Sequence, residues 1–297
     1  MAGHGRQVVC ALGLLLTVAT ASGASGQTSS AYSVTVKSQA GDSLQPAYEG
    51  WEKNSDGTYS FWFGYLNRNW AQELNIPVGP NNNIEPGGPD RGQPEFFQTG
   101  EQKRRQMFAF KVVVPANWPK ERDLIWTVTA NGTTLKAFAS LRPDYMIDVN
   151  VISANRGVQR DTDPVDKNSP PTITEAPKDQ TITLGTPLTL TLAIKDDGMP
   201  KPLRERPGRG EGAVNLKQLL RTSWLQWRGP GRVTFSPEVV PVTDADGKNS
   251  RTGGTATTKA TFDKPGTYVL TAYAEDMSLF SMHTLTVKVI GGASAKD

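Results

Sequence analysis

The stretch Tyr59–Leu66, YSFWFGYL, limits the possible folds of this chain more than any other. Side chains of an extended backbone point alternately to opposite faces, so the aromatic residues at its odd-numbered positions share one face. Trp62 and Leu66 make the other face apolar as well. A strand that is apolar on both faces is normally central in a β-sandwich. We therefore predict a central, buried strand here.

Short strand-like segments separated by turn signals recur along the rest of the chain. In the first half they are residues 32–38, 106–115, 124–132 and 134–141. In the second half they are residues 171–177, 180–185, 187–198, 224–237, 255–276 and 283–291. Asp56-Gly57 and Asn131-Gly132 are typical turn dipeptides, and we expect a further hairpin around Lys264–Gly266. This spacing predicts an all-β sandwich fold, and only residues 213–222 have a helical pattern.

Composition divides the chain into two domains in tandem. The segment between them is polar, rich in charge and ends in two prolines, as linkers often do. We predict two Ig-like antiparallel β-sandwich domains joined by this linker. The predicted parts are a signal peptide at 1–26, a first sandwich at 27–152, the linker at 153–170, a second sandwich at 171–291 and a tail at 292–297.

The N-terminus has the three-part pattern of a secretory signal peptide. Arg6 lies in a short polar start, an apolar run covers residues 8–18, and small residues follow. Ala19–Ala21 and Ala24–Gly26 both fit a cleavage site. The apolar run is shorter than a membrane span, and no second run follows it. We expect a secreted or periplasmic protein without a membrane span.

Cysteine usage and charge exclude several classes of protein. Cys10 is the only cysteine, and cleavage of the signal peptide removes it. A lipoprotein carries its cysteine after the apolar run, so we expect no lipidation at Cys10. The mature chain then has no disulfide, no thiolate metal site and no cysteine nucleophile. The formal net charge of +3 is close to balance and argues against a general nucleic-acid binder.

Three segments of the second half carry a resemblance to known domains. They are LGTPLTLTLAIKDDG (184–198), FDKPGTYVLTAYAED (262–276) and LTVKV (285–289). These segments resemble the Ig-like, PKD-like and cadherin-like sandwiches of bacterial envelope proteins. The resemblance implies the fold and leaves the function open, because this fold serves many tasks. The first half, with YEGW and FGYLNRNW, is similar to uncharacterised secreted bacterial proteins, which imply no activity.

The sequence offers little catalytic machinery. His283 is the only histidine after the signal peptide. It alternates with Leu285 and Val287, which favours a strand histidine with a structural hydrogen bond over a general base. The sequence has no motif of a zinc protease, a serine hydrolase or a nucleotide-binding loop. No carboxylate pair stands out for glycoside chemistry. We predict that the protein is not an enzyme and uses no organic cofactor.

A turn at residues 244–249, DADGKN, has oxygen-bearing side chains at a spacing that calcium accepts. Asp244, Asp246 and Asn249 are the candidate ligands, although the distal glutamate of an EF-hand loop is missing. Asp196 and Asp197 offer a similar pair. Asp-Gly and Asn also favour turns without any metal, so both interpretations stay open.

The segment 199–232 is a candidate for contact with an anionic partner. It is rich in Lys and Arg, with Arg204, Arg206 and Arg209 as its candidate contacts. Clustered basic side chains suit an acidic polysaccharide, a phosphate or a peptide carboxylate. The alternative is a solvated loop without a partner.

The loop at residues 76–95 is a second candidate surface. It is rich in Gly, Pro and Asn, and loops of this length without secondary structure are usually functional or disordered. Its five prolines favour an ordered loop. It either presents ligand contacts or covers an edge strand. The predicted surface contacts of the loop are Asn81, Asn82, Asn83, Asp90 and Arg91.

These features predict an exported, non-enzymatic binding or structural protein of the envelope or extracellular space. Its partner is expected to be a protein or a polysaccharide rather than a nucleic acid. The alternative is a carbohydrate-binding module accessory to an enzyme, in which Trp70 or Trp118 forms an exposed platform for sugar rings.

Overall fold

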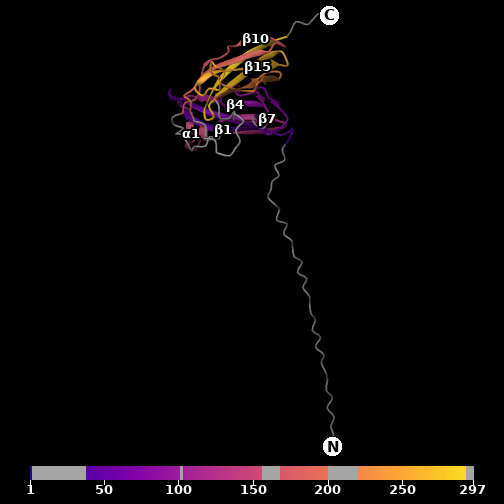
Figure 1. Ribbon diagram of the computed structural model, residues 1–297. Helices are drawn as coiled ribbons and strands as arrows, with labels where there is room; N and C mark the ends of the chain where they lie inside the picture. The colour runs from indigo at the N-terminus through magenta and orange to yellow at the C-terminus, as the bar shows by residue number, and fades with distance from the viewer. Residues whose placement is uncertain (2–37, 101–102, 156–167, 200–219, 292–297) are drawn as a thin grey trace, which may run out of the picture. The chain divides into compact units, whose positions relative to one another are not determined.

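The computed structural model describes Met1 and residues 38–100, 103–155, 168–199 and 220–291. The chain divides into two units, Met1–Val36 and Lys37–Asp297. The helices and strands described below belong to the second unit (Figure 1). No helix in the described ranges is long and apolar enough to cross a membrane.

Several predictions fall outside the described residues. They concern the signal peptide beyond Met1, all but the last residue of the strand at 32–38, and most of the helix at 213–222. The candidate contacts Arg204, Arg206 and Arg209 also lie there. All of these remain predictions.

The first half of the described chain forms a sandwich of antiparallel sheets. One sheet has the strand order β1-β2-β6, the facing sheet has the order β4-β7-β8, and a short two-stranded sheet pairs β3 with β5. The strands are β1 (Leu44–Lys53), β2 (Tyr59–Asn67), β3 (Leu74–Asn75), β4 (Asn82–Glu85), β5 (Phe96–Phe97), β6 (Arg105–Val114), β7 (Leu124–Ala130) and β8 (Thr133–Ala139). The central position of β2 confirms the prediction from its two apolar faces.

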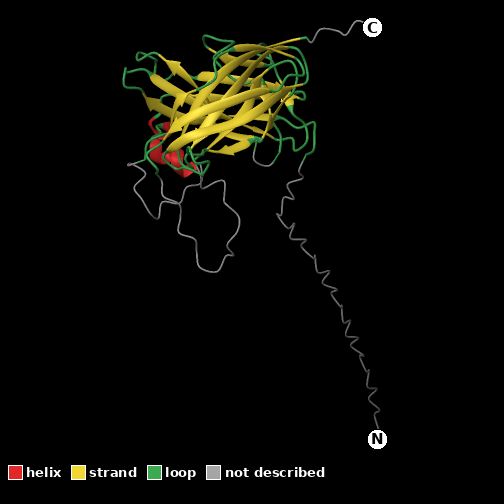
Figure 2. Cartoon of the chain, turned by 45° about the horizontal axis from the view of Figure 1, so that its top comes forward, coloured by secondary structure: helices red, strands yellow, loops and turns green. Residues whose placement is uncertain are grey.

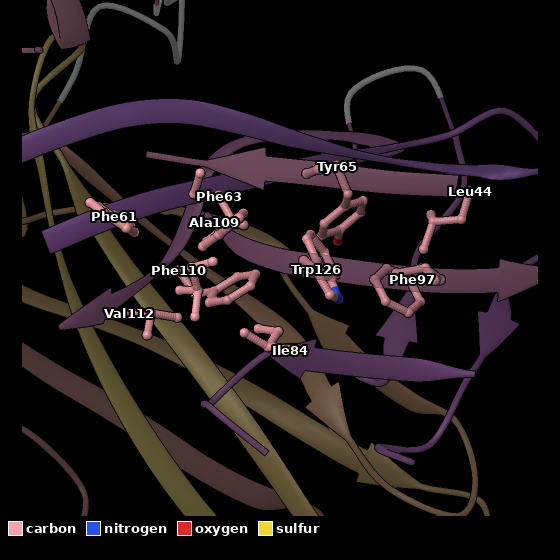
Figure 3. Packing of buried hydrophobic residues seen from close by; sticks show 14 of the residues in the cluster. Leu44, Phe61, Phe63, Tyr65, Ile84, Phe97, Ala109, Phe110, Val112 and Trp126 are labelled. Carbon is pink, nitrogen blue, oxygen red and sulfur yellow. The ribbon is translucent and has the colours of Figure 1, made fainter. Parts of the chain in front are cut away.

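Aromatic side chains fill the space between these sheets (Figure 3). Phe63 of β2 stacks on Phe110 of β6 at a centroid distance of 5.3 Å, and Trp126 of β7 meets Phe110 edge-on at 5.0 Å. The opposite face of β2 is covered by the second half of the chain, because Trp62 packs against Phe280 at 6.0 Å. Both faces of β2 are therefore buried, which is why both are apolar.

The second half forms a second sandwich. Its sheets have the orders β10-β17-β16-β12-β14 and β13-β15-β11-β9, and every pair is antiparallel except β10 with β17. The strands are β9 (Thr172–Glu175), β10 (Gln180–Thr183), β11 (Leu188–Lys195), β12 (Arg221–Arg228), β13 (Val233–Ser236), β14 (Val239–Pro241), β15 (Gly253–Phe262), β16 (Gly266–Glu275) and β17 (Phe280–Ile290). Figure 2 shows the predominance of strands over helix.

The strand arrangement of the second half is that of an immunoglobulin domain. β9, β11, β15 and β13 lie in one sheet, and β12, β16 and β17 lie in the other. Tyr268, near the start of β16, donates its hydroxyl to the carbonyl oxygen of Lys264 at 2.8 Å. This contact is the tyrosine corner of such domains. Trp224 of β12 is buried between the sheets, as the core tryptophan of these domains is. The all-β, Ig-like fold class is confirmed.

The predicted hairpin at 255–276 is wrong. β15 pairs with β11 and β13, whereas β16 pairs with β12 and β17. The chain therefore crosses from one sheet to the other at Lys264–Gly266. A Pro-Gly turn marks a change of direction, and it does not determine which strands pair on either side of it.

Two element boundaries also differ from the prediction. Arg221 and Thr222, expected at the end of a helix, begin strand β12 instead. Leucines a few residues apart fit both a helix and a buried strand. Pairing with β16 makes Arg221 and Thr222 part of a strand. A 3₁₀ turn, η1 (Pro143–Tyr145), precedes helix α1 (Val149–Asn155), which extends into the predicted linker. The domain boundaries themselves stay a prediction.

Candidate functional site

Buried side-chain amides, that of Asn82 among them, hold the loop 76–95 in place. Asn82 is completely buried, and its Nδ2 donates to the carbonyl oxygens of Ile76 at 2.9 Å and Pro94 at 2.8 Å. Its Oδ1 accepts a hydrogen bond from Nε1 of Trp126 at 2.9 Å. The two ends of the loop are thereby tied together and to the first core. The middle of the loop contributes β4, which pairs with β7.

Arg228, at the end of β12, binds the second half of this loop. Its guanidinium donates two hydrogen bonds of 2.8 Å to the carboxylate of Asp90. The same guanidinium donates to the carbonyl oxygen of Gln93 at 2.8 and 3.2 Å. Such bidentate, charge-assisted pairs fix geometry as well as distance.

Trp227 reinforces the contact from the preceding position. Its Nε1 donates to the carbonyl oxygen of Gly92 at 3.0 Å, and its own carbonyl oxygen accepts from the amide of Glu95 at 2.9 Å. The indole is buried in the core of the first sandwich. We call this set of contacts the loop–strand lock; it comprises Asp90, Gly92, Gln93 and Glu95 of the loop with Trp227 and Arg228 of β12.

The charges of the lock stabilise each other. The hydrogen bonds from Arg228 lower the pKa of Asp90 to about 2, against the opposing effect of burial. The Asp90 carboxylate in turn raises the pKa of Arg228. Asp90 therefore stays ionised well below neutral pH, and its carboxylate pairs with Arg228 of the same chain.

The structure places the other predicted contacts of the loop as follows. Asn81 is exposed and Asn83 is half-buried. The expected surface position of Asn82 is wrong, because its amide organises the interior of the loop. Arg91 donates to two backbone carbonyl groups, each at 3.1 Å. Binding of a ligand by any of these residues stays a prediction.

Both tryptophans considered for a sugar platform lie beside an arginine. Arg104 sits 4.2 Å from the ring centre of Trp70, and Arg122 sits 5.1 Å from that of Trp118. Both rings are half-buried. A guanidinium over a ring forms a cation–π contact and occupies that face. Each ring thus has at most one face left for a sugar.

The candidate calcium turn uses Asp244 to shape its own backbone. Oδ1 of Asp244 accepts from the amides of Asp246 at 3.0 Å and Lys248 at 2.9 Å. Asp246 and Asn249 are exposed. Within the described ranges, no group of three or more His, Cys, Asp or Glu side chains could hold a metal ion together. Calcium at this turn stays a prediction.

His283 makes the kind of contact that its strand position predicts. Its Nε2 lies 3.0 Å from the carbonyl oxygen of Pro177, and the ring is half-buried. Leu285 and Val287, in the same phase of β17, are fully buried. This agrees with a structural histidine.

Sequence reasoning missed the role of Trp227 and Arg228. They sit in a segment where aromatic residues and leucine predict only a buried strand. Alternation along β12 puts Trp227 on the face opposite Trp224, and a register shift between Gln226 and Arg228 accompanies the turn of Arg228 toward the same loop. Bulges of this kind leave no clear mark in a single sequence.

Comparisons with known proteins returned solved structures of low similarity. No family model and no curated protein sequence matches the chain. The tandem Ig repeats of Dlar are 11% identical with a TM-score of 0.28, covering 84% of this chain and 98% of that one. A complex of titin M10 with an obscurin like 1 Ig domain is 15% identical with a TM-score of 0.24, covering 42% and 98%.

A third similar structure is a mutant of the SrpA adhesin from Streptococcus sanguinis. It is 16% identical with a TM-score of 0.26, covering 43% of this chain and 61% of the adhesin. Because these scores are low, the Ig-like assignment rests on the strand order and the Tyr268 contact described above.

Proposed function

We propose that this chain is an exported, non-catalytic protein that serves as a binding or structural module of the cell envelope or the extracellular space. The loop–strand lock is the observation that carries the proposal. Asp90 and the carbonyl oxygen of Gln93, both in the loop 76–95, bind Arg228 of the second sandwich and so join the two sandwiches. A rigid pair of sandwiches suits a protein that spaces or presents surfaces.

Export is supported by the pattern of residues 1–26, with a short polar start, an apolar run and small residues. It is tested by expressing the full chain in a bacterial host, fractionating the cells and sequencing the N-terminus of the exported form. We expect a mature chain that begins after Ala21 or Gly26. A chain that stays in the cytoplasm with its first residues attached contradicts export.

Binding is tested by co-sedimentation of the exported protein with envelope fractions and with insoluble polysaccharides, at low and high salt. Binding to envelope fractions supports the proposal. Binding to one glycan that is lost in Trp70→Ala favours the accessory carbohydrate module instead. Release of sugars from any of these polysaccharides contradicts a non-catalytic protein.

A further inference from the structure

Near the ends of three segments of the second sandwich, polar side chains have buried atoms without a well-formed hydrogen bond. Asp196 follows β11, Asp276 follows β16, and Asn168 precedes β9. Asp276 is 3% exposed and Asn168 is 7% exposed. Oδ1 of Asp196, Oδ2 of Asp276 and both polar atoms of the Asn168 amide are buried without a hydrogen bond of normal geometry. Buried polar atoms are nearly always paired, so these atoms require an explanation.

The topology brings the three segments together. The start of β9 pairs with the end of β11, where Thr172 lies opposite Lys195. The amide of Ser169 donates to Oδ2 of Asp197 at 2.8 Å, which holds the residue after Asn168 against the end of β11. The Asn168 side chain lies next to the Asp276 carboxylate, and its hydrogen-bonding contact lowers the pKa of Asp276.

Backbone amides hold one oxygen of each aspartate. Oδ1 of Asp276 accepts from the amides of Ser278 at 2.8 Å and Leu279 at 2.7 Å. Oδ2 of Asp196 accepts from the amide of Gly198 at 2.9 Å. The backbone therefore orients both carboxylates before any ligand arrives.

Ionisation of both Asp196 and Asp276 without a counter-ion is unfavourable in this cluster. Burial raises the pKa of Asp276 to about 6. Burial also raises the pKa of Asp196 to about 6, and the charges of Asp276 and Asp197 add to this effect. Arg251 opposes it in part and donates to the carbonyl oxygen of Gly198 at 3.2 Å. A positive ligand between the carboxylates relieves the remaining cost.

We propose that Asp196, Asp276 and Asn168 form a binding site for a hard divalent cation, with calcium as the best fit. Calcium takes six to eight oxygen ligands in irregular geometry, including carboxylates, amide oxygens and water. Magnesium requires near-ideal octahedral geometry and keeps most of its water. The Asn168 amide can turn its oxygen toward the ion, because its two ends have the same shape.

The number and kind of ligands at the site determine its expected affinity for calcium. It supplies two carboxylates and one amide, so water and main-chain carbonyl oxygens complete the shell. Extracellular calcium modules with few charged ligands bind with dissociation constants on the order of 10⁻⁴–10⁻³ M. The alternative explanation of the unpaired atoms is a proton retained on one carboxyl group, and the experiment separates the two.

The test uses the exported protein after treatment with EDTA, at about pH 7.5, above the raised pKa values of both aspartates. Thermal unfolding and isothermal titration with CaCl₂ or MgCl₂ are the measurements. We expect about 10 mM CaCl₂ to raise the Tm by about 3–8 °C, and MgCl₂ to do less. Asp196→Asn and Asn168→Ala should remove most of this shift. The matched control is Asp246→Asn in the turn at 244–249, which should keep it.

The outcomes are decisive in either direction. The absence of both binding heat and a Tm shift with CaCl₂ overturns the proposal, and so does an unchanged shift in Asp196→Asn. A response lost only in Asp246→Asn assigns calcium to the turn at 244–249 instead. A Tm that rises on acidification from about pH 7 to 5 but not with CaCl₂ assigns neutralisation to a proton. Asp276→Asn should also remove the shift, and if this variant does not fold, Asp196→Asn and Asn168→Ala still decide.

Discussion

Arg228 and Asp90 join parts of the chain that are 138 residues apart in sequence. The Arg228 side chain is 21% exposed, whereas that of Asp90 is 52% exposed. Ion pairs with an exposed partner contribute little to stability, since water screens them. Most of the stabilisation by Arg228 therefore comes from its charged hydrogen bonds to the carbonyl oxygen of Gln93.

We expect Arg228→Ala to lower the free energy of unfolding by about 1.5–3 kcal/mol, because the buried Gln93 carbonyl loses a charged donor. Asp90→Asn should cost about 0.5–1 kcal/mol. Urea denaturation measures both changes. Arg232 is 65% exposed and pairs with Glu73 at 3.3 Å, so Arg232→Ala serves as the control, expected within about 0.5 kcal/mol. Equal losses for the two arginines would contradict the special role of Arg228.

The Arg228–Asp90 pair makes the free energy of unfolding depend on pH in the acid range. The pKa of Asp90 is about 2 in the folded chain, below the value of about 3.9 expected after unfolding. A carboxylate with a depressed pKa stabilises the fold above its unfolded pKa and loses this effect as the pH falls through its folded pKa. The stability difference between wild type and Asp90→Asn should be constant above about pH 5 and vanish between about pH 4 and 2. Urea curves across this range would refute the argument if the difference persists at the acid end.

The tyrosine corner can be tested by removing a single atom, the hydroxyl oxygen of Tyr268. Tyr268→Phe removes only the hydroxyl that donates to the carbonyl oxygen of Lys264. We expect a loss of about 1–2 kcal/mol in unfolding free energy, since the ring stays buried and one hydrogen bond disappears. Tyr145→Phe, at an exposed position, should change stability by less than about 0.5 kcal/mol. Chemical denaturation of both variants gives the comparison.

Among the elements, the loop 76–95 depends strongly on the side chain of Asn82. Asn82→Ala leaves the carbonyl oxygens of Ile76 and Pro94 and the indole nitrogen of Trp126 without the partners they have now. We expect a loss of about 2–4 kcal/mol and faster proteolysis within the loop. Asn81→Ala, one residue earlier and exposed, should leave both properties unchanged. A loop that resists protease equally in both variants would show that other contacts order it.

Strand β12 contributes one tryptophan to each of the two hydrophobic cores. Trp224 is buried in the core of the second sandwich, whereas Trp227 is buried in the core of the first. The register shift between Gln226 and Arg228 lies at the change from one core to the other. Alternation alone puts Trp224 and Trp227 on opposite faces, and the irregularity lets Arg228 bind the same loop as Trp227.

At the scale of the whole molecule, Trp227 couples the two sandwiches. Because a side chain of β12 completes the first core, we expect calorimetry of the wild type to show one cooperative transition. Trp227→Ala should cost about 3–5 kcal/mol and separate the transition into two. Trp224→Ala should destabilise the second sandwich by a similar amount. Two separate transitions already in the wild type would show that the sandwiches unfold independently.

The sequence by itself determined the features that depend on local patterns, namely buried strands and tight turns. The alternation in Tyr59–Leu66 predicts a buried central strand, and β2 is one. Asn131-Gly132 predicts a tight turn, and both residues have positive φ, 48° and 79°, between β7 and β8. Alternation and turn chemistry depend only on neighbouring residues, so they are sufficient to predict an all-β sandwich.

Contacts between distant residues were decided only by the tertiary structure. Nothing near Lys264–Gly266 indicates that β15 and β16 belong to different sheets. No neighbour of Asn82 indicates that its amide is buried, and no neighbour of Arg228 indicates a pair with Asp90. The unpaired oxygens of Asp196 and Asp276 likewise belong to residues that follow two different strands, β11 and β16. Such contacts arise because packing brings remote segments together, and local sequence carries no record of that.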